Sequence, residues 1–189
     1  RFIHLFPVAV LPNGKKQDFD IDYFDPGYRE FTKNFAKRLA MALYPYDNVS
    51  TIVIWEEKVG LNANFEKYKD KVVITPLFAS KAGKAAFKDW LEKKHKTIKD
   101  LNNKWGTDYS SFEEAIDASL SDYSDGAADN DHRQYDILEF GQMTLIDFTR
   151  DFVDAYKSVD PTMLFQCRHW DLFGPERAID PRYSFLDSF

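Results

Sequence analysis

The chain has 189 residues, of which 44% are hydrophobic and 16% aromatic, so it is long enough to bury a substantial core. Its formal net charge of -6 comes from interspersed acidic and basic residues without a basic block, which argues against nucleic acid as the main partner. Cys167 is the only cysteine, which excludes an intramolecular disulfide and a multi-cysteine zinc site, and no apolar run approaches the ~20 residues of a membrane span.

The first part of the chain alternates between helix and strand signals. A helix is predicted over Tyr28–Leu43, where apolar residues recur at helical spacing: Phe31, Phe35, Leu39 and Ala42. Val49–Trp55 is a β-branched run that predicts a buried strand. We expect Asn62–Asp70 to be a loop or a helical turn that leads into the apolar segment Val72–Phe78.

The second part of the chain is mainly helical in pattern. Short helices are predicted at about Lys84–Lys94, Thr97–Lys104 and Phe112–Leu120. The polar segment Asp122–His132 predicts an exposed loop, and the longest helix follows over about Gln134–Val159. This helix carries one apolar stripe, formed by Ile137, Gly141, Leu145, Phe148, Phe152 and Tyr156. Thr162–Cys167 is the next strand, so the order of elements is the βαβα pattern of a parallel sheet.

Polar and aromatic side chains directly follow both predicted strands. The first strand ends in the adjacent carboxylates Glu56 and Glu57, and the second delivers Arg168, His169 and Trp170. In a parallel α/β barrel, catalytic carboxylates lie at this C-terminal end of the strands. The competing interpretation is a solvated loop start for the two Glu, and a structural ion pair with a packed Trp for the second group.

Four segments in sequence order resemble one family. Ala85–Thr107 contains an amphipathic helix, a second short helix and a Trp-Gly-Thr turn, and it resembles the insert after the fourth strand of the family 42 glycoside hydrolases. Asp22–Arg29 is similar to the entry into that family's third helix, and Pro7–Lys16 to the loop before it. Asp136–Pro161 resembles its long fourth helix, which ends at Asp-Pro.

The resemblance implies an α/β fold of the (β/α)8 TIM-barrel type. Such a barrel needs about 250 residues, so we expect residues 1–189 to form only part of the catalytic barrel, around its fourth and fifth strands, with an inserted helical segment at about 62–130. The implied function is that of a glycoside hydrolase, a retaining exo-β-galactosidase-like enzyme with a carbohydrate substrate and no cofactor. The chain alone is expected to be inactive, and oligomeric state and compartment stay open.

The resemblance also assigns roles to the paired carboxylates. The family's fourth strand ends in Asn-Glu, where Glu is the general acid/base and Asn binds the sugar's 2-hydroxyl, whereas this chain has Glu56-Glu57. The acid/base role therefore carries over to Glu57 and the Asn role to Glu56. A frame shifted by one residue would make Glu56 the acid and put Trp55 in place of the Asn. Many members hold a zinc-binding cysteine cluster after this strand, but Thr75–Ala85 contains no cysteine, so no metal is expected.

Strand geometry separates the two carboxylates. Successive strand side chains point to opposite sides, so Glu56 would share the orientation of Ile52 and Ile54 while Glu57 would take the other. The two cannot be the pair of carboxylates about 5–5.5 Å apart that retaining hydrolysis requires. The resemblance places the nucleophile on the family's seventh strand, beyond this chain. The candidates within the chain are Asp171, Glu176 and Asp187, none of which carries a matching motif.

Other residues have candidate roles in sugar binding or in packing. Arg168, His169 and Trp170 are candidate substrate-binding residues together with Trp55, with Trp stacking on a sugar and Arg bonding to hydroxyls. We expect Trp90 and Trp105 to pack within the insert and His95 to lie on the surface. Two other functions remain open, a catalytically inactive carbohydrate-binding barrel and an unrelated α/β-barrel enzyme.

Overall fold

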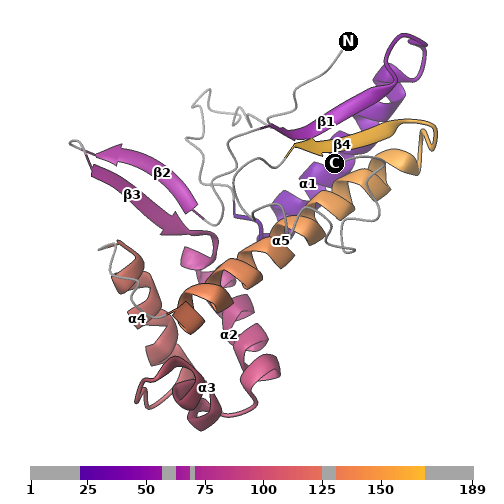
Figure 1. The fold of residues 1–189 in the computed structure, drawn as a ribbon. Helices are drawn as coiled ribbons and strands as arrows, with labels where there is room; N and C mark the ends of the chain where they lie inside the picture. Colours follow the sequence, from indigo (N-terminus) through magenta and orange to yellow (C-terminus); the bar gives the residue numbers. More distant parts are fainter. Residues whose placement is uncertain (1–21, 57–62, 69–70, 125–130, 169–189) are drawn as a thin grey trace. The chain divides into compact units, whose positions relative to one another are not determined.

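The two predicted strands on either side of the helical segments pair with each other in parallel. The computed structural model describes residues 22–56, 63–68, 71–124 and 131–168. Strand β1 (Thr51–Glu56) lies beside β4 (Leu164–Arg168), and the register matches Ile52 with Phe165 (Figure 1). The predicted parallel arrangement is confirmed. Because a parallel pair requires a crossover connection, the long segment between β1 and β4 is a consequence of this topology.

The described residues divide into two compact units. The first unit comprises residues 26–56 and 145–168, and the second comprises 22–25, 63–68, 71–124 and 131–144. All described residues of the predicted insert, about 62–130, belong to the second unit. None of the helices among the described residues combines the length and the hydrophobicity of a membrane-spanning segment.

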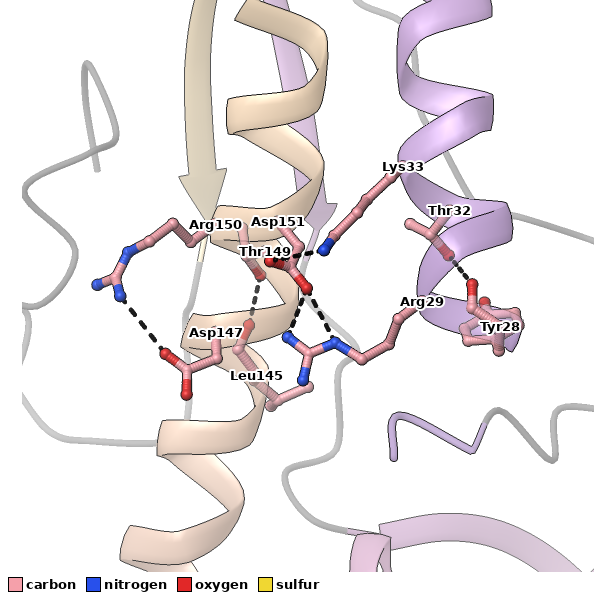
Figure 2. Close-up of polar contacts among 9 residues, drawn as sticks. All are labelled: Tyr28, Arg29, Thr32, Lys33, Leu145, Asp147, Thr149, Arg150 and Asp151. Carbon is pink, nitrogen blue, oxygen red and sulfur yellow. Dashed lines mark hydrogen bonds and ion pairs between the residues drawn. The ribbon is translucent and has the colours of Figure 1, made fainter. Parts of the chain in front are cut away.

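In the first unit, α1 (Pro26–Leu43) contacts the C-terminal half of α5 (Asp131–Lys157). Arg29 donates from Nε and Nη2 to the same oxygen of Asp151, at 2.9 and 2.6 Å, and Lys33 approaches the other oxygen at 3.5 Å (Figure 2). Because these side chains are about one-third exposed, solvent screens the ion pairs, and they orient the two helices more than they stabilise them.

The buried face of α1 differs from the predicted stripe by one residue. Thr32, Ala36 and Ala40 are buried, whereas Phe31 is 48% exposed. Each buried residue directly follows a residue of the predicted stripe, which corresponds to a rotation of the helix by about 100°. Small side chains let the helix backbone approach its neighbours closely, and Thr32 satisfies its buried hydroxyl by donating to the Tyr28 carbonyl at 2.9 Å.

The apolar stripe predicted for α5 is confirmed, because all six of its residues are buried. At its C-terminal end, Phe152 and Tyr156 contact Phe165 of β4 edge to face, with ring centroids 6.3 and 5.2 Å apart. The helix therefore covers the face of β4 that carries Phe165. Ile52 and Val53 of β1 are both buried although they point to opposite faces, as expected for a strand inside a parallel sheet.

The second unit begins with an antiparallel hairpin that the sequence interpretation missed. Strand β2 (Ala63–Tyr68) pairs with β3 (Lys71–Pro76), and a single 3-10 turn, η1 (Leu77–Ala79), follows. The expectation of a loop or helical turn at Asn62–Asp70 was therefore wrong. The apolar alternation of β2 is short, because Ala63 and Phe65 follow it and Lys67 breaks it. The pairing with β3, a contact outside the local pattern, therefore defines the strand.

Three predicted helices are present in the second unit. They are α2 (Lys81–His95), α3 (Ile98–Trp105) and α4 (Phe112–Ser124). The hydroxyl of Ser80 accepts a hydrogen bond from the Gly83 amide at 2.9 Å and caps α2, while Thr97 caps α3 in the same way. Gly106 ends α3 in the left-handed conformation at φ 70°, which glycine adopts without strain.

The core of this unit is aromatic. Trp105 is 2% exposed, and Trp90 packs on Phe87 and Phe140 with ring centroids 6.0 and 5.8 Å away. Both Trp residues therefore pack within the insert, as predicted. Phe24, which precedes α1 in the chain, stacks on Phe140 at 5.6 Å and so joins this core.

A buried carboxylate connects three helices of the second unit. Asp136 of α5 accepts hydrogen bonds from Lys94 at 2.8 Å and from the Trp105 indole at 2.8 Å, and His95 Nε2 lies 2.7 Å from it. Burial disfavours the charge on Lys94, but its hydrogen bonds to Asp136 and Glu139 outweigh this and raise the pKa of the ammonium. The His95 side chain is only 8% exposed, so the expectation of a surface histidine was wrong.

Asp136→Asn is expected to lower the free energy of unfolding by about 2–4 kcal/mol. The amide cannot replace the carboxylate as the acceptor of three donors, and the Lys94 charge would lose its buried partner. The matched control is Asp117→Asn, which removes an ion pair to Lys84 at a carboxylate that is 67% exposed. This control should cost less than about 0.5 kcal/mol. Urea unfolding measures both variants, and equal losses would contradict the structural role of Asp136.

Tyr156→Phe is expected to leave stability at pH 7 unchanged or to raise it by up to about 1 kcal/mol, because the buried Tyr156 hydroxyl has no hydrogen-bond partner in the described structure. Burial and, to a smaller extent, the nearby Asp160 charge raise the pKa of Tyr156 from 10.0 to about 12. Between these pH values the unfolded chain releases the proton while the folded chain keeps it. The stability that depends on a protonated Tyr156 is therefore fully present below pH 10 and is lost as the pH rises through 12.

Thermal unfolding from pH 8 to pH 12 measures this effect. The stability of Tyr156→Phe should fall less with rising pH than the stability of the wild type. Tyr44→Phe is the control, since Tyr44 is 68% exposed, and its profile should follow the wild type. The same pH profile in Tyr156→Phe as in the wild type would refute the assignment.

Candidate active site

The candidate site lies where β1 and β4 end. In the parallel register Trp55 pairs with Cys167, and Glu56 pairs with Arg168 as the last residues of the two strands. Because both strands run in the same direction, their C-terminal ends meet at one edge of the sheet. The structure therefore brings together the backbone positions of three predicted site residues, Trp55, Glu56 and Arg168.

The remaining predicted site residues lie outside the described part of the chain. They are Glu57, which follows Glu56 in the sequence, and His169 and Trp170, which follow Arg168. Their assignment to the site therefore stays a prediction. The described structure contributes the scaffold, a parallel strand pair that ends in a glutamate on β1 and an arginine on β4.

The ladder is irregular directly before this edge. Val53 pairs with Gln166 and Trp55 with Cys167, so β1 has one residue more than β4 between these two pairs. Such an irregularity interrupts the simple alternation of side chains along a strand and is common next to active sites. The orientation of Glu56 therefore cannot be derived by counting from Ile52, as the sequence interpretation did.

Other clusters of charged groups among the described residues are structural. Asp136 is buried, but its partners are donors from the protein itself, so nothing is left for a substrate to bind. No group of three or more His, Cys, Asp or Glu side chains within residues 22–56, 63–68, 71–124 and 131–168 is arranged to hold a metal ion. The sequence contained no signal for the Asp136 network, because its members are up to 42 residues apart.

Comparison with known sequences identifies a family. The model of glycoside hydrolase family 42, described as β-galactosidase, matches residues 13–180 of this chain. A β-galactosidase of Arthrobacter sp. is 33% identical over 84 residues, which are 42% of this chain and 12% of the relative. The family match spans both strands of the candidate site and the whole segment between them.

Comparison with solved structures identifies the fold. An exo-β-agarase superposes with a TM-score of 0.60 at 18% identity, over 89% of this chain and 24% of its own. The catalytic domain of a β-amylase from Paenibacillus polymyxa superposes with a TM-score of 0.58 at 14% identity, over 92% of this chain and 44% of its own. A β-galactosidase from the psychrophilic Marinomonas ef1 superposes with a TM-score of 0.52 at 19% identity, over 82% of this chain and 23% of its own. These proteins are α/β-barrel glycoside hydrolases, so the fold of this chain is part of such a barrel, and it spans about a quarter of the agarase and the β-galactosidase.

Proposed function

The chain belongs to the β-galactosidases of glycoside hydrolase family 42, and on this basis we propose that the complete protein is a retaining exo-β-galactosidase with Glu57 as its general acid/base. One observation carries the proposal. The family match includes both strands of a parallel pair whose ends bring the residue before Glu57 beside Arg168. The C-terminal edge of parallel strands is where barrel enzymes hold their catalytic groups.

The proposed reaction has two steps. Glu57 first protonates the leaving oxygen while a carboxylate from another part of the complete protein attacks the anomeric carbon and forms a glycosyl-enzyme intermediate. Glu57 then removes a proton from the water that hydrolyses this intermediate. A buried strand suits this role because it fixes the carboxyl group relative to the sugar, and Ile52 is fully buried.

Arg168, His169, Trp170 and Trp55 are proposed to bind the sugar. Arg168 is the last residue of β4 and Trp55 the penultimate residue of β1, so both belong to the edge where the sugar would bind. An indole ring can stack on the apolar face of a galactose ring, and a guanidinium donates to hydroxyls.

A catalytically inactive carbohydrate-binding barrel is the second candidate function. It is favoured by one observation, the carboxylate at Glu56 where the family pattern has an amide. A protein of this kind would bind galactosides without hydrolysing them. Activity measurements on the complete protein distinguish the two candidates.

In the complete protein, Glu57→Gln is expected to lower turnover of an unactivated β-galactoside by roughly 10²–10⁴-fold. The amide keeps the shape of the side chain and removes only the proton that the leaving group needs. An aryl galactoside with a good leaving group needs little protonation, so its glycosylation step should be far less affected. Steady-state kinetics on lactose and on a nitrophenyl galactoside measure this difference.

Glu30→Gln is the matched control, because Glu30 is exposed on α1 and accepts a hydrogen bond from Asn34 at 3.0 Å. It should keep wild-type activity on both substrates. Wild-type activity of Glu57→Gln on lactose would exclude Glu57 as the acid. Binding of galactosides without turnover by the complete wild-type protein would favour the binding-only candidate.

A further inference from the structure

Large apolar side chains line one face of α1. The rings of Tyr28 and Phe31 stack with centroids 6.4 Å apart, and the rings of Phe31 and Phe35 with centroids 6.5 Å apart. Leu39 lies one helical turn beyond Phe35, is half-buried and continues the row. We call these four residues the apolar row of α1. Phe31, in the row between Tyr28 and Phe35, is 48% exposed.

The apolar row points away from α5. Lys33 approaches Asp151 of α5 at 3.5 Å (Figure 2), and it is two residues from both Phe31 and Phe35. Two residues correspond to about 200° around a helix, so both phenylalanines lie about 160° from Lys33. Among the described residues, the rings of Phe31 and Phe35 stack only on rings of α1 itself. Helix α5 therefore does not cover this face of α1.

Such a row is unusual on a helix face that borders solvent. The residues that α1 buries are small, such as Ala36 and Ala40, whereas its phenylalanines stay partly exposed. Burial of phenylalanine side chains is one of the main gains when a helix packs against a neighbour. A continuous apolar row in water forgoes this gain, so it indicates a contact surface.

The barrel fold identifies the neighbour. The chain is part of an α/β barrel and spans 24% of the exo-β-agarase that it resembles. Consecutive βα units of such a barrel lie side by side, so each helix has the preceding unit on one side and the following unit on the other. Because α5 follows α1 in the chain, the side of α1 that faces away from α5 belongs to the preceding unit.

We propose that the apolar row of α1 is the surface on which the preceding βα unit of the complete protein packs. Tyr28 makes this surface continuous with the contact between α1 and α5, because its ring also stacks on Phe148 with centroids 5.8 Å apart. The occupant is an apolar segment of the same polypeptide that precedes α1 in the sequence. Helix α1 is then held from both sides, by the preceding unit and by α5.

Maleimide labelling of the complete protein tests whether the row is covered. The variants are Phe31→Cys and, as the matched control, Lys37→Cys, since Lys37 is exposed on α1 about 120° from Phe31. Phe31→Cys is expected to react at least about tenfold more slowly than Lys37→Cys, because a packed side chain reacts only when the contact opens. Peptide-resolved mass spectrometry follows each introduced thiol separately from Cys167. Equal labelling rates would overturn the proposal.

Photo-crosslinking identifies the segment that covers the row. Benzoylphenylalanine in place of Phe31 keeps an aromatic ring at this position of the complete protein. The expected crosslinks join position 31 to peptides that precede α1 in the same polypeptide. Crosslinks between two polypeptides, or protection of Phe31→Cys that disappears on dilution, would assign the row to a second copy and overturn the proposal. Crosslinks to α5 or to later segments would overturn it as well.

Thermal unfolding of the complete protein provides a readout that introduces no reactive group. Phe31→Ala is expected to lower Tm by roughly 3–8 °C, because it leaves a cavity in the contact, and Phe31→Leu should restore part of this loss. Lys37→Ala should shift Tm by less than about 1 °C. Equal shifts for Phe31→Ala and Lys37→Ala would contradict the packing. None of these measurements uses activity, so they decide the inference independently of the proposed function.

Discussion

The parallel pairing of β1 with β4 is the constraint on which the account of this protein depends. A parallel pair cannot be closed by a tight turn, so the chain between the strands has to cross over, and the described part of this connection contains a hairpin and four α-helices. The same pairing fixes a common C-terminal edge for two segments that are more than a hundred residues apart in the sequence. The match of Glu56 with Arg168 follows from this register alone.

Much of the fold could be predicted because its signals are local. The spacing of Ile137, Leu145 and Phe152 identified α5 and its buried face, and the β-branched run before Trp55 identified β1. The errors have physical causes as well. β2 is defined by its partner strand, since its apolar alternation stops at Lys67. α1 turns small residues inward, so Phe31 remains half exposed.

The site was predictable only in part. Strand ends and a family resemblance select Glu56, Glu57 and Arg168 as candidates, and the register places the backbones of Glu56 and Arg168 side by side. The extra residue between Val53 and Trp55 interrupts the alternation from which an orientation would be counted, and sequence gives no sign of it. The burial of His95 against Asp136 was missed for a different reason, because this contact joins helices that are distant in sequence.

Azide rescue of alanine variants of the complete protein tests the central claim, that β1 delivers the general acid/base. Removing an acid/base carboxylate leaves space for azide to attack the glycosyl-enzyme intermediate, which is formed readily from an aryl galactoside. If Glu57 is the acid/base, azide accelerates Glu57→Ala and yields β-galactosyl azide, while Glu56→Ala shows no such acceleration. Rescue of Glu56→Ala instead, or an α-configured azide from Glu57→Ala, would contradict it.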